Sequence, residues 1–181
     1  KILRSEADDL MLPTRELSIE LAARMLVLCG VADSIQDSKF KIQNALDSGA
    51  ALEKFRRNIE LQNGNPKVCD EPEILLDKNL LEVEIKAAQS GFVRQIDAIT
   101  VGESVSRIGG GRVRVEDKID FAVGYACRAK IGDEISENKI LGILYCRDEN
   151  QAQQISEKLR DAYKIGEEKP QNLELIKKII S

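Results

Sequence analysis

The spacing of apolar residues predicts that the first third of the chain is helical. Between Thr14, a residue type that caps helices, and Gly30, apolar side chains are too dense for one narrow stripe. A helix of this kind is expected to be buried on most of its sides. Gly30 is expected to end it, since glycine readily takes the left-handed conformation found just after helices.

Two more helices are expected before a linker. Asp33 or Ser34 can cap the first of them, which should continue to about Leu46. The second, at 50–61, has apolar residues on one face and paired charges on the other, as on a solvated helix surface. A turn-rich stretch with two prolines then predicts a linker at 66–80.

After the linker the hydrophobic period changes, which predicts strands. Residues 81–87 alternate apolar with charged side chains, as in a half-buried strand. Gly91 separates this segment from a second short strand at 92–96, and further strands are expected at 122–129 and 139–145. The second half of the chain is therefore expected to contain a β-rich domain.

Helices are expected among these strands, which makes the predicted fold class α+β. One is expected at 100–108, before a run of glycines. Another, at 149–163, is amphipathic. Residues 173–180 are expected to add one or two helical turns.

Composition narrows the function classes. The hydrophobic fraction of 43% and charged fraction of 32% are those of a globular protein, and no apolar run approaches the roughly 20 residues of a membrane span. A net charge of −4 argues against a nucleic-acid partner, which needs clustered cations. The chain contains no histidine, so the commonest general base and metal ligand are both absent from its sequence.

The four cysteines form no C-x-x-C pair, which argues against zinc and redox sites. Cys29, Cys69, Cys127 and Cys146 are expected to be reduced thiols, buried as small apolar residues in a cytoplasmic protein. The chain starts at Lys1 without a signal-peptide pattern and reads as if entered partway through.

A glycine cluster is the first candidate for chemistry. The glycines are Gly109, Gly110 and Gly111, and Arg112 and Arg114 follow them. Backbone N–H groups free of side chains can wrap a phosphate, and arginines can complete such a site. However, the cluster matches neither the Walker motif nor the dinucleotide fingerprint. A flexible or tightly turned loop is the alternative, and we favour it.

An acidic set lies just beyond, at Glu116, Asp117 and Asp120, beside Lys118. Paired carboxylates can perform acid–base chemistry or bind a hard cation. The spacing is not that of an EF-hand, and mixed charges in a loop are usually solvated. We therefore favour a solvated charged loop over a catalytic or cation site.

Two segments, 88–93 and 130–135, resemble the paired turns of biotinyl- and lipoyl-carrier domains. Carriers of this barrel-sandwich architecture present a modified lysine at the tip of a tight hairpin. Between residues 93 and 130 the sequence shows no such lysine hairpin, and Lys118 lacks the flanking residues that carriers have. The segments thus indicate a barrel-sandwich without its modification site.

A set of short segments along the chain is informative when taken in order. The segments are 14–18, 26–31, 46–55, 62–66, 90–93, 96–98, 109–112, 116–120, 122–124, 130–133 and 162–165. No single one is diagnostic, but the ordered set is specific and covers nearly the whole chain. In this order the segments resemble the thymidine and pyrimidine-nucleoside phosphorylases.

The resemblance implies a domain organisation and a limited set of site residues. Residues 1–65 would be the last helices of a large α/β domain, 66–80 a linker, and 81–181 a barrel-sandwich-like α/β hammerhead domain at the C-terminus. The family's phosphate and base motifs match no position here, so no catalytic, substrate-binding, cofactor or metal residue is transferred. The exception is a loop expected near the mouth of the cleft: Gly109, Gly110, Gly111, Arg112 and Arg114.

The activity implied is that of a cytoplasmic homodimeric pentosyltransferase. It would cleave thymidine or related nucleosides with inorganic phosphate to give base and (deoxy)ribose 1-phosphate, without a cofactor, nucleic-acid partner or membrane. The present chain would be inactive alone, because it would help to shape the enzyme without contributing catalytic residues. The alternatives are a biotinyl- or lipoyl-type carrier and a non-catalytic scaffold domain.

Overall fold

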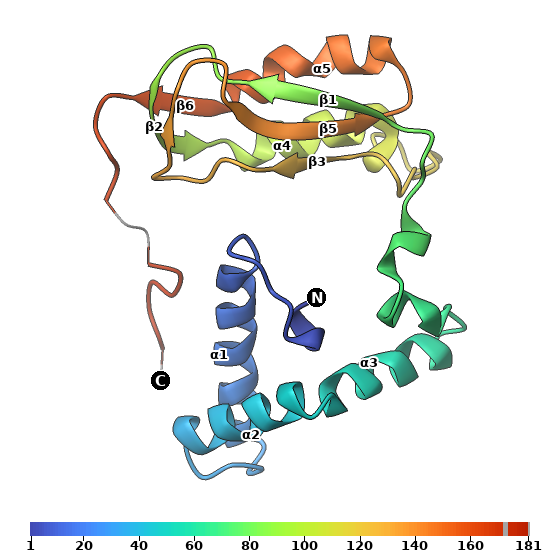
Figure 1. Ribbon diagram of the computed structural model, residues 1–181, viewed down its shortest axis with the longest axis vertical. Coiled ribbons are helices and arrows are strands. Elements are labelled where there is room, and N and C mark those ends of the chain that lie inside the picture. Colours follow the sequence, from blue (N-terminus) through green and yellow to red (C-terminus); the bar gives the residue numbers. More distant parts are fainter. Residues whose placement is uncertain (172–173, 181) are drawn as a thin grey trace. The chain divides into compact units, whose positions relative to one another are not determined.

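A computed structural model describes residues 1–171 and 174–180 and divides the chain into two compact units (Figure 1). The first, the helical unit, contains Lys1–Leu75 and the described residues from Glu174 onward. The second, the sheet unit, contains Leu76–Leu173.

The helical unit contains three α-helices and three short 3₁₀ turns. Their bounds are α1 Leu12–Leu28, α2 Ile35–Asp47, α3 Ala50–Leu61, η1 Ile2–Arg4, η2 Pro66–Cys69 and η3 Pro72–Leu75. Ser34, not Asp33, caps α2, because its hydroxyl accepts a hydrogen bond from the Asp37 amide at 3.1 Å. Helices α2 and α3 confirm the predicted pair.

Helix α1 differs from the prediction at its start and in its burial. It begins at Leu12, before Thr14, and contains Pro13 in its first turn, where proline's fixed φ suits a helix and its missing N–H costs nothing. Ala23 is its only fully buried residue, whereas Leu21, Met25 and Leu28 are 56%, 63% and 85% exposed. The expectation of burial on most sides was wrong for this unit, because α1 packs mainly against α2.

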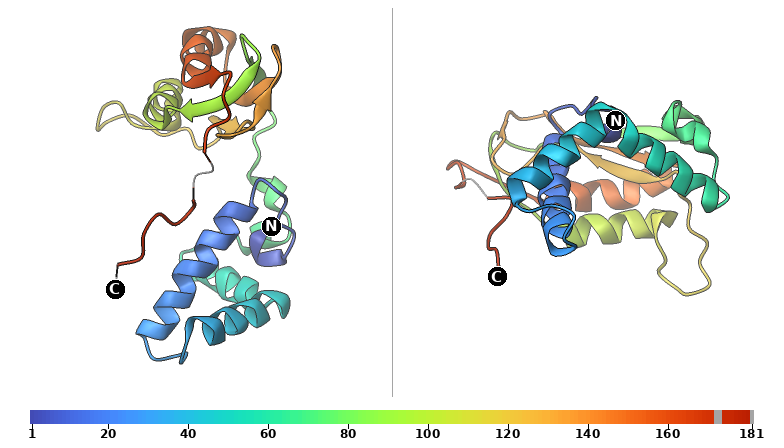
Figure 2. Two further views of the ribbon diagram at one scale, coloured as in Figure 1. Left: turned by 90° about the vertical axis from the view of Figure 1, so that its left-hand side faces the viewer. Right: turned by 90° about the horizontal axis from the view of Figure 1, so that it is seen from below.

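In its described part, the sheet unit contains two open, antiparallel, three-stranded sheets and two α-helices. One sheet has the order β1-β5-β3 and the other β4-β2-β6. Helices α4 and α5 pack together on one face of the first sheet (Figures 1 and 2). The bounds are β1 Leu81–Lys86, β2 Gly91–Ile96, α4 Ala98–Val105, β3 Gly124–Cys127, β4 Glu134–Ile135, β5 Ile140–Cys146, α5 Glu149–Asp161 and β6 Tyr163–Gly166.

These elements confirm the α+β class, and the two sheets do not close into a barrel within the described ranges. Two buried clusters form the core of the sheet unit. The first includes Leu144, Ile155 and Leu159, and lies where α5 meets β5. The second, which includes Val93 and Leu141, draws residues from both sheets.

Strand β6 was not predicted from the sequence. The helix expected to reach Tyr163 ends at Asp161, and Tyr163–Gly166 instead pair with β2. The amphipathic period runs smoothly into this segment, so only pairing with a distant strand distinguishes it. Of the expected 173–180 helix, residue 173 lies outside the described part, and 174–180 contain no helical turn.

Two other boundaries are corrected by local hydrogen bonds. Helix α4 begins at Ala98, before Thr100, because the Asp97 carboxylate accepts from the amides of its first turn. The strand expected at 122–129 shrinks to β3. It ends where Arg128 and Ala129 both donate their amides to the Leu141 carbonyl, at 2.9 Å each, which interrupts the regular ladder.

Gly91 shows why the Ser90-Gly91 turn needs glycine. Its φ is +146°, a conformation that L side chains rarely adopt. A Cβ atom there would lie 2.7 Å from the Gly166 carbonyl oxygen in β6. Close approach between β2 and β6 therefore depends on the missing side chain.

Among the described residues, no helix is both long and apolar enough to cross a membrane.

Candidate functional site: the glycine loop and its anchor

The candidate site is the segment 109–121, here called the glycine loop, which follows α4. An irregular helical turn, Ser106–Gly110, leads into it, and Gly109 takes a φ of +98°. A Cβ at Gly110 would lie 2.6 Å from Val105 Cγ1, and one at Gly111 would lie 3.1 Å from Ser106 Cβ. The glycines thus allow the chain to fold tightly against the turn before them, which supports the turned-loop interpretation.

The tip of the loop is organised by Asp117. Its carboxylate accepts hydrogen bonds from the amides of Val113 at 3.0 Å and Arg114 at 2.7 Å, and its own amide donates to the Arg114 carbonyl. Asp117 therefore satisfies backbone donors of the loop itself, as aspartate often does in turns. Both of these bonds fall on Oδ2, so this oxygen holds the tip of the loop in its turn.

The base of the loop is closed by Asp120. Its amide donates to the Gly109 carbonyl at 2.8 Å, and its carboxylate accepts from the Ala122 amide at 3.1 Å. Arg147 binds the same carboxylate with both arms of its fork, Nε to Oδ2 at 2.7 Å and Nη2 to Oδ1 at 3.0 Å. Hydrogen bonding from Arg147, followed by that from Ala122, lowers the pKa of Asp120.

Arg147 has a second carboxylate partner. Its Nη1 donates to Asp77 Oδ2 at 2.6 Å, and Asp77 also accepts from the Asn79 amide at 2.9 Å. The Asn79 amide and then Arg147 lower the pKa of Asp77, while its two carboxylate partners raise the pKa of the Arg147 guanidinium. This trio was not predicted from the sequence, because no motif spacing links positions 77, 120 and 147.

The loop surface carries unpaired cations and apolar side chains. Arg112 and Arg114 are exposed, and neither forms an ion pair within 1–171 and 174–180. Val113, Val115 and Phe121 are 70%, 84% and 92% exposed. The structure thus presents the two arginines named from the sequence on an anchored loop with free guanidinium groups.

The acidic set and the cysteines form no metal site in the described part of the chain. Asp117 and Asp120 instead serve the loop backbone and Arg147. All four cysteines are free thiols: Cys69 and Cys146 are buried and Cys127 is half-buried, but Cys29 is exposed. Burial of all four was therefore a wrong expectation; Cys29 caps the end of α1, where little packs against the helix.

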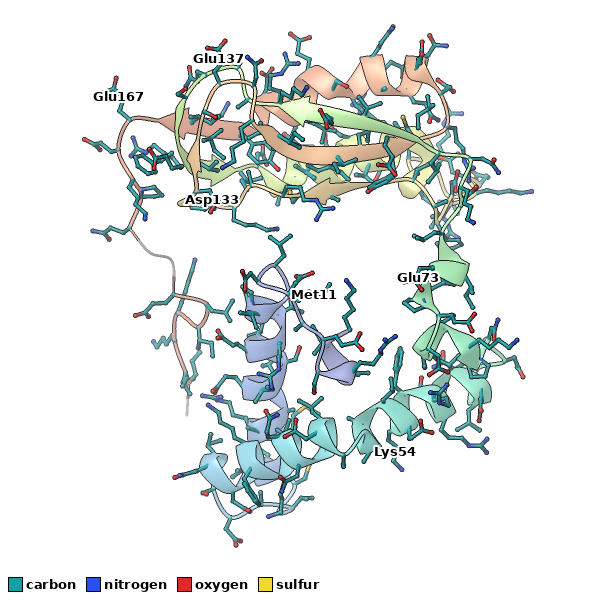
Figure 3. The ribbon with its side chains drawn as sticks, in the orientation of Figure 1. Met11, Lys54, Glu73, Asp133, Glu137 and Glu167 are labelled. Carbon is teal, nitrogen blue, oxygen red and sulfur yellow. The ribbon has the colours of Figure 1, made fainter. Side chains whose placement is uncertain are left out.

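The two carrier-like turns meet in space. Val93 donates its amide to the Asp133 carbonyl at 3.0 Å, and Gly132 donates to the Val93 carbonyl at 2.8 Å. On the other side of β4, Ser90 Oγ accepts from the Glu137 amide at 2.9 Å. Figure 3 labels Asp133 and Glu137 on the two connections that flank β4.

A carrier would present its lysine on a hairpin between strands. Here the chain between β2 and β3 forms α4 and the glycine loop, and Lys118 lies in that loop. The order of elements therefore does not favour the carrier alternative.

Comparison with known proteins identifies the family. Residues 92–166, which include the whole glycine loop, match the pyrimidine nucleoside phosphorylase C-terminal domain. A thymidine phosphorylase from Burkholderia cenocepacia is 35% identical over 152 residues, which cover 84% of this chain. The chain belongs to the thymidine and pyrimidine-nucleoside phosphorylase family.

Other family members give the same relationship. The pyrimidine-nucleoside phosphorylase of Staphylococcus aureus is 38% identical over 126 residues, covering 70% of this chain and 29% of the relative. That of Bacillus subtilis is 32% identical over 153 residues, covering 84% and 35%. The chain thus spans about a third of the length of the phosphorylases it matches, 35% for the Burkholderia protein.

Proposed function

We propose that this chain is part of a phosphorylase that reversibly cleaves thymidine or related pyrimidine nucleosides with inorganic phosphate. The observation that carries the proposal is the family match over residues 92–166, with relatives named for this activity aligned over most of the chain. A phosphate oxygen would form a bond to C1′ of the sugar as the C1′–N bond breaks. The base would leave with the bonding electrons and take up a proton.

Catalysis of this kind depends on positioning and on stabilising charge. The transition state would resemble an oxocarbenium ion, with negative charge growing on the departing base. Two acidic residues of the loop, Asp117 and Asp120, are engaged in hydrogen bonds to the loop backbone and to Arg147. We therefore propose that these residues shape the site while other parts of the enzyme hold phosphate and nucleoside.

The glycine loop is the proposed contribution of this chain to the cleft. Arg112 and Arg114 are cationic, exposed and unpaired in the described structure, while Asp117 and Asp120 hold the loop in a defined shape. Two free guanidinium groups on an anchored loop suit a role near an anionic substrate. The loop is proposed to close the mouth of the cleft when phosphate and nucleoside are bound.

The remaining expectations stand as part of the same proposal. The active enzyme would be a cytoplasmic homodimer that requires no cofactor, and this chain would be inactive alone. The sheet unit would be of the barrel-sandwich hammerhead type, which the meeting of its two carrier-like turns supports.

Release of thymine from thymidine tests the activity. The protein should be assayed as its gene encodes it, with and without inorganic phosphate, beside the 181-residue chain. We expect phosphate-dependent release of thymine or uracil and of sugar 1-phosphate from the gene-encoded protein only. Release without phosphate, or no release from any pyrimidine nucleoside, would overturn the proposal.

The contribution of the glycine loop to phosphorolysis is tested by the double variant Arg112→Ala/Arg114→Ala. A matched control is Arg128→Ala/Lys130→Ala, which removes two exposed cations outside the loop. We expect the loop variant to lower kcat/KM by about tenfold or more and the control to leave it unchanged. Equal kcat and KM in all three proteins would show that the loop plays no part.

A further inference from the structure

Arg147 binds two aspartates from different segments, and the proposed phosphorylase function assigns no role to this contact. Its guanidinium binds Asp120 at the base of the glycine loop and Asp77 in the segment leading from the linker to β1. These two aspartates are 43 residues apart in sequence and make no direct hydrogen bond to each other in the part of the chain described. The side chain of Arg147 is therefore the bridge between them.

The loop side of this bridge is a continuous chain of hydrogen bonds. Arg147 binds the carboxylate of Asp120, and the backbone amide of Asp120 donates to the Gly109 carbonyl at 2.8 Å. A second contact supports the first: the Arg147 amide donates to Gln151 Oε1, and Gln151 Nε2 donates to the Ile108 carbonyl at 3.4 Å. Both ends of the glycine loop thus connect to Arg147.

The linker side is equally defined. The carboxylate of Asp77 binds Arg147 and the Asn79 amide, which fixes the chain just before β1. At the other end of the linker, Arg56 binds Asp70 through two arms, at 2.8 and 2.9 Å. Between the clamped positions, Ile74, Leu75 and Leu76 are exposed.

We propose that Arg147 is a positioning residue that couples the linker to the glycine loop. When the Asp77 end of the linker shifts, Arg147 must follow it or lose that partner, and its hold on Asp120 changes accordingly. The two carboxylates bind different nitrogens of one rigid guanidinium, Nη1 for Asp77 and Nε with Nη2 for Asp120, so each partner holds the group in the orientation that the other needs. Loss of the Asp77 contact would leave the side chain free to turn and would weaken the pair with Asp120. The linker thereby sets how firmly the loop is held.

The coupling itself is independent of any enzymatic activity and is tested on this chain. Amide hydrogen exchange, measured by NMR at Asp120 and Ala122, reports on the loop base. We expect Asp77→Ala, which alters no residue of the loop, to accelerate exchange at both amides by about threefold or more. The control Lys86→Ala breaks an exposed pair with Glu84 (3.0 Å) in the same unit and should leave both rates unchanged.

Reciprocity supplies the second measurement. The free energy of coupling between two sites is reciprocal, so a change at the loop base should also be detected on the linker side. Asp120→Ala should therefore accelerate exchange of the Asn79 amide, which lies on the linker side. In Arg147→Lys, which keeps the charge but loses the planar fork, neither aspartate substitution should have a remote effect.

An unchanged or slower exchange at Asp120 and Ala122 in Asp77→Ala would overturn the coupling. Global loss of structure would be visible as faster exchange in the buried strand β5. That result would also contradict the proposal, which predicts an effect confined to the loop base. The Arg147→Lys arm keeps the test decisive even if complete removal of this side chain unfolds the unit.

The consequence for catalysis rests on the proposed function. In the gene-encoded enzyme, Asp77→Ala should lower kcat/KM for the nucleoside with an unchanged thermal midpoint, and Arg147→Lys should remove that difference. If exchange shows the coupling but no variant or wild-type protein has phosphorolytic activity, the proposed function fails and the coupling stands. If the enzyme is active and exchange shows no coupling, the positioning role fails alone.

Discussion

The Tyr125 hydroxyl in β3 donates a hydrogen bond to the Tyr163 hydroxyl in β6 at 3.2 Å, and so links the two sheets of the sheet unit. Tyr163 in turn donates to the Leu141 carbonyl at 3.3 Å, and its oxygen lies 3.0 Å from the Cys127 sulfur. A hydroxyl has one proton, so Tyr163 accepts from Tyr125 and Cys127 while it donates to Leu141. This order makes Tyr163 the centre of the cluster.

Removing the central hydroxyl should cost more than removing a peripheral one. Tyr163→Phe leaves the Tyr125 hydroxyl and the Cys127 thiol without their acceptor, whereas the Leu141 carbonyl keeps two backbone donors, Arg128 and Ala129. We expect a loss of about 1–2 kcal/mol in the free energy of unfolding for Tyr163→Phe and about 0.5 kcal/mol for Tyr125→Phe. Urea unfolding measures both.

The double variant completes this comparison. Because both single changes remove the same hydrogen bond, the Tyr125→Phe/Tyr163→Phe protein should lose less stability than the sum of the two losses. Strict additivity would show that the two hydroxyls do not interact.

The same cluster predicts alkaline behaviour. Burial raises the pKa of Tyr125 to about 12, and burial together with its hydrogen-bond partners raises the pKa of Tyr163. An unfolded tyrosine ionises near pH 10, so between these values the unfolded chain loses protons that the folded protein keeps. Stability is therefore fully present below about pH 10 and should fall as the pH rises toward the folded pKa values.

Absorbance of tyrosinate checks this directly. The signal lost on changing Tyr125 to Phe should titrate near pH 12 in the folded protein. Ionisation of that residue near pH 10, with the fold intact, would contradict the burial argument.

Local signals explain which elements were predictable. Helices α2 and α3 and strands β1 and β2 carry their own period and their own caps or turns, so their existence follows from nearby residues. Strand β6 does not, because its identity depends on Gly91 and Phe92 in β2, about 75 residues earlier.

The candidate site divides in the same way. The glycines and arginines of the loop were visible because they are consecutive in sequence. Its anchor was not, because Asp77, Asp120 and Arg147 are isolated charges whose meeting is a property of the folded sheet unit. The dense apolar residues of α1 likewise indicated a helix. Their burial could not be predicted, because it depends on which distant segments pack against α1.

Two glycines of the sheet unit should respond to alanine in opposite ways. At Gly142 in β5, a Cβ would lie 2.7 Å from the Ala126 carbonyl oxygen and would also overlap the Tyr125 ring. A Cβ at Gly102 in α4 would have no neighbouring atom within 4 Å, and the backbone there has a helical conformation that permits a side chain. Gly142 is therefore required for steric reasons, whereas nothing near Gly102 requires a glycine.

We expect Gly142→Ala to lower the free energy of unfolding by about 1–3 kcal/mol, as overpacking does. Gly102→Ala should raise it by about 0.5–1 kcal/mol, because alanine favours the helix and restricts the unfolded chain. Thermal and urea unfolding of both variants measure these changes. A neutral Gly142→Ala would show that β3 can shift away from β5, and a destabilising Gly102→Ala would reveal a hidden contact on α4.

Acid should release the glycine loop by a defined route. Hydrogen bonds from Arg147, and then from Ala122, lower the pKa of the Asp120 carboxyl below the value of about 3.9 that an unfolded aspartate has. A lowered folded pKa means that the contribution of this group to stability is present above the unfolded value and disappears as the pH falls through the folded one. Below about pH 4 the Asp120 anchor should therefore weaken progressively.

The variant Asp120→Asn isolates this effect, because its side chain keeps its size and an acceptor oxygen for the Ala122 amide but cannot titrate. We expect the free energy of unfolding of the wild type to fall more steeply with decreasing pH than that of Asp120→Asn over the range in which Asp120 is protonated. At neutral pH the wild type should be the more stable protein, since only the charged carboxylate forms the two-armed pair with Arg147. Parallel pH profiles would mean that solvent screens the pair completely, and Arg147 would then hold the loop through Gln151 alone.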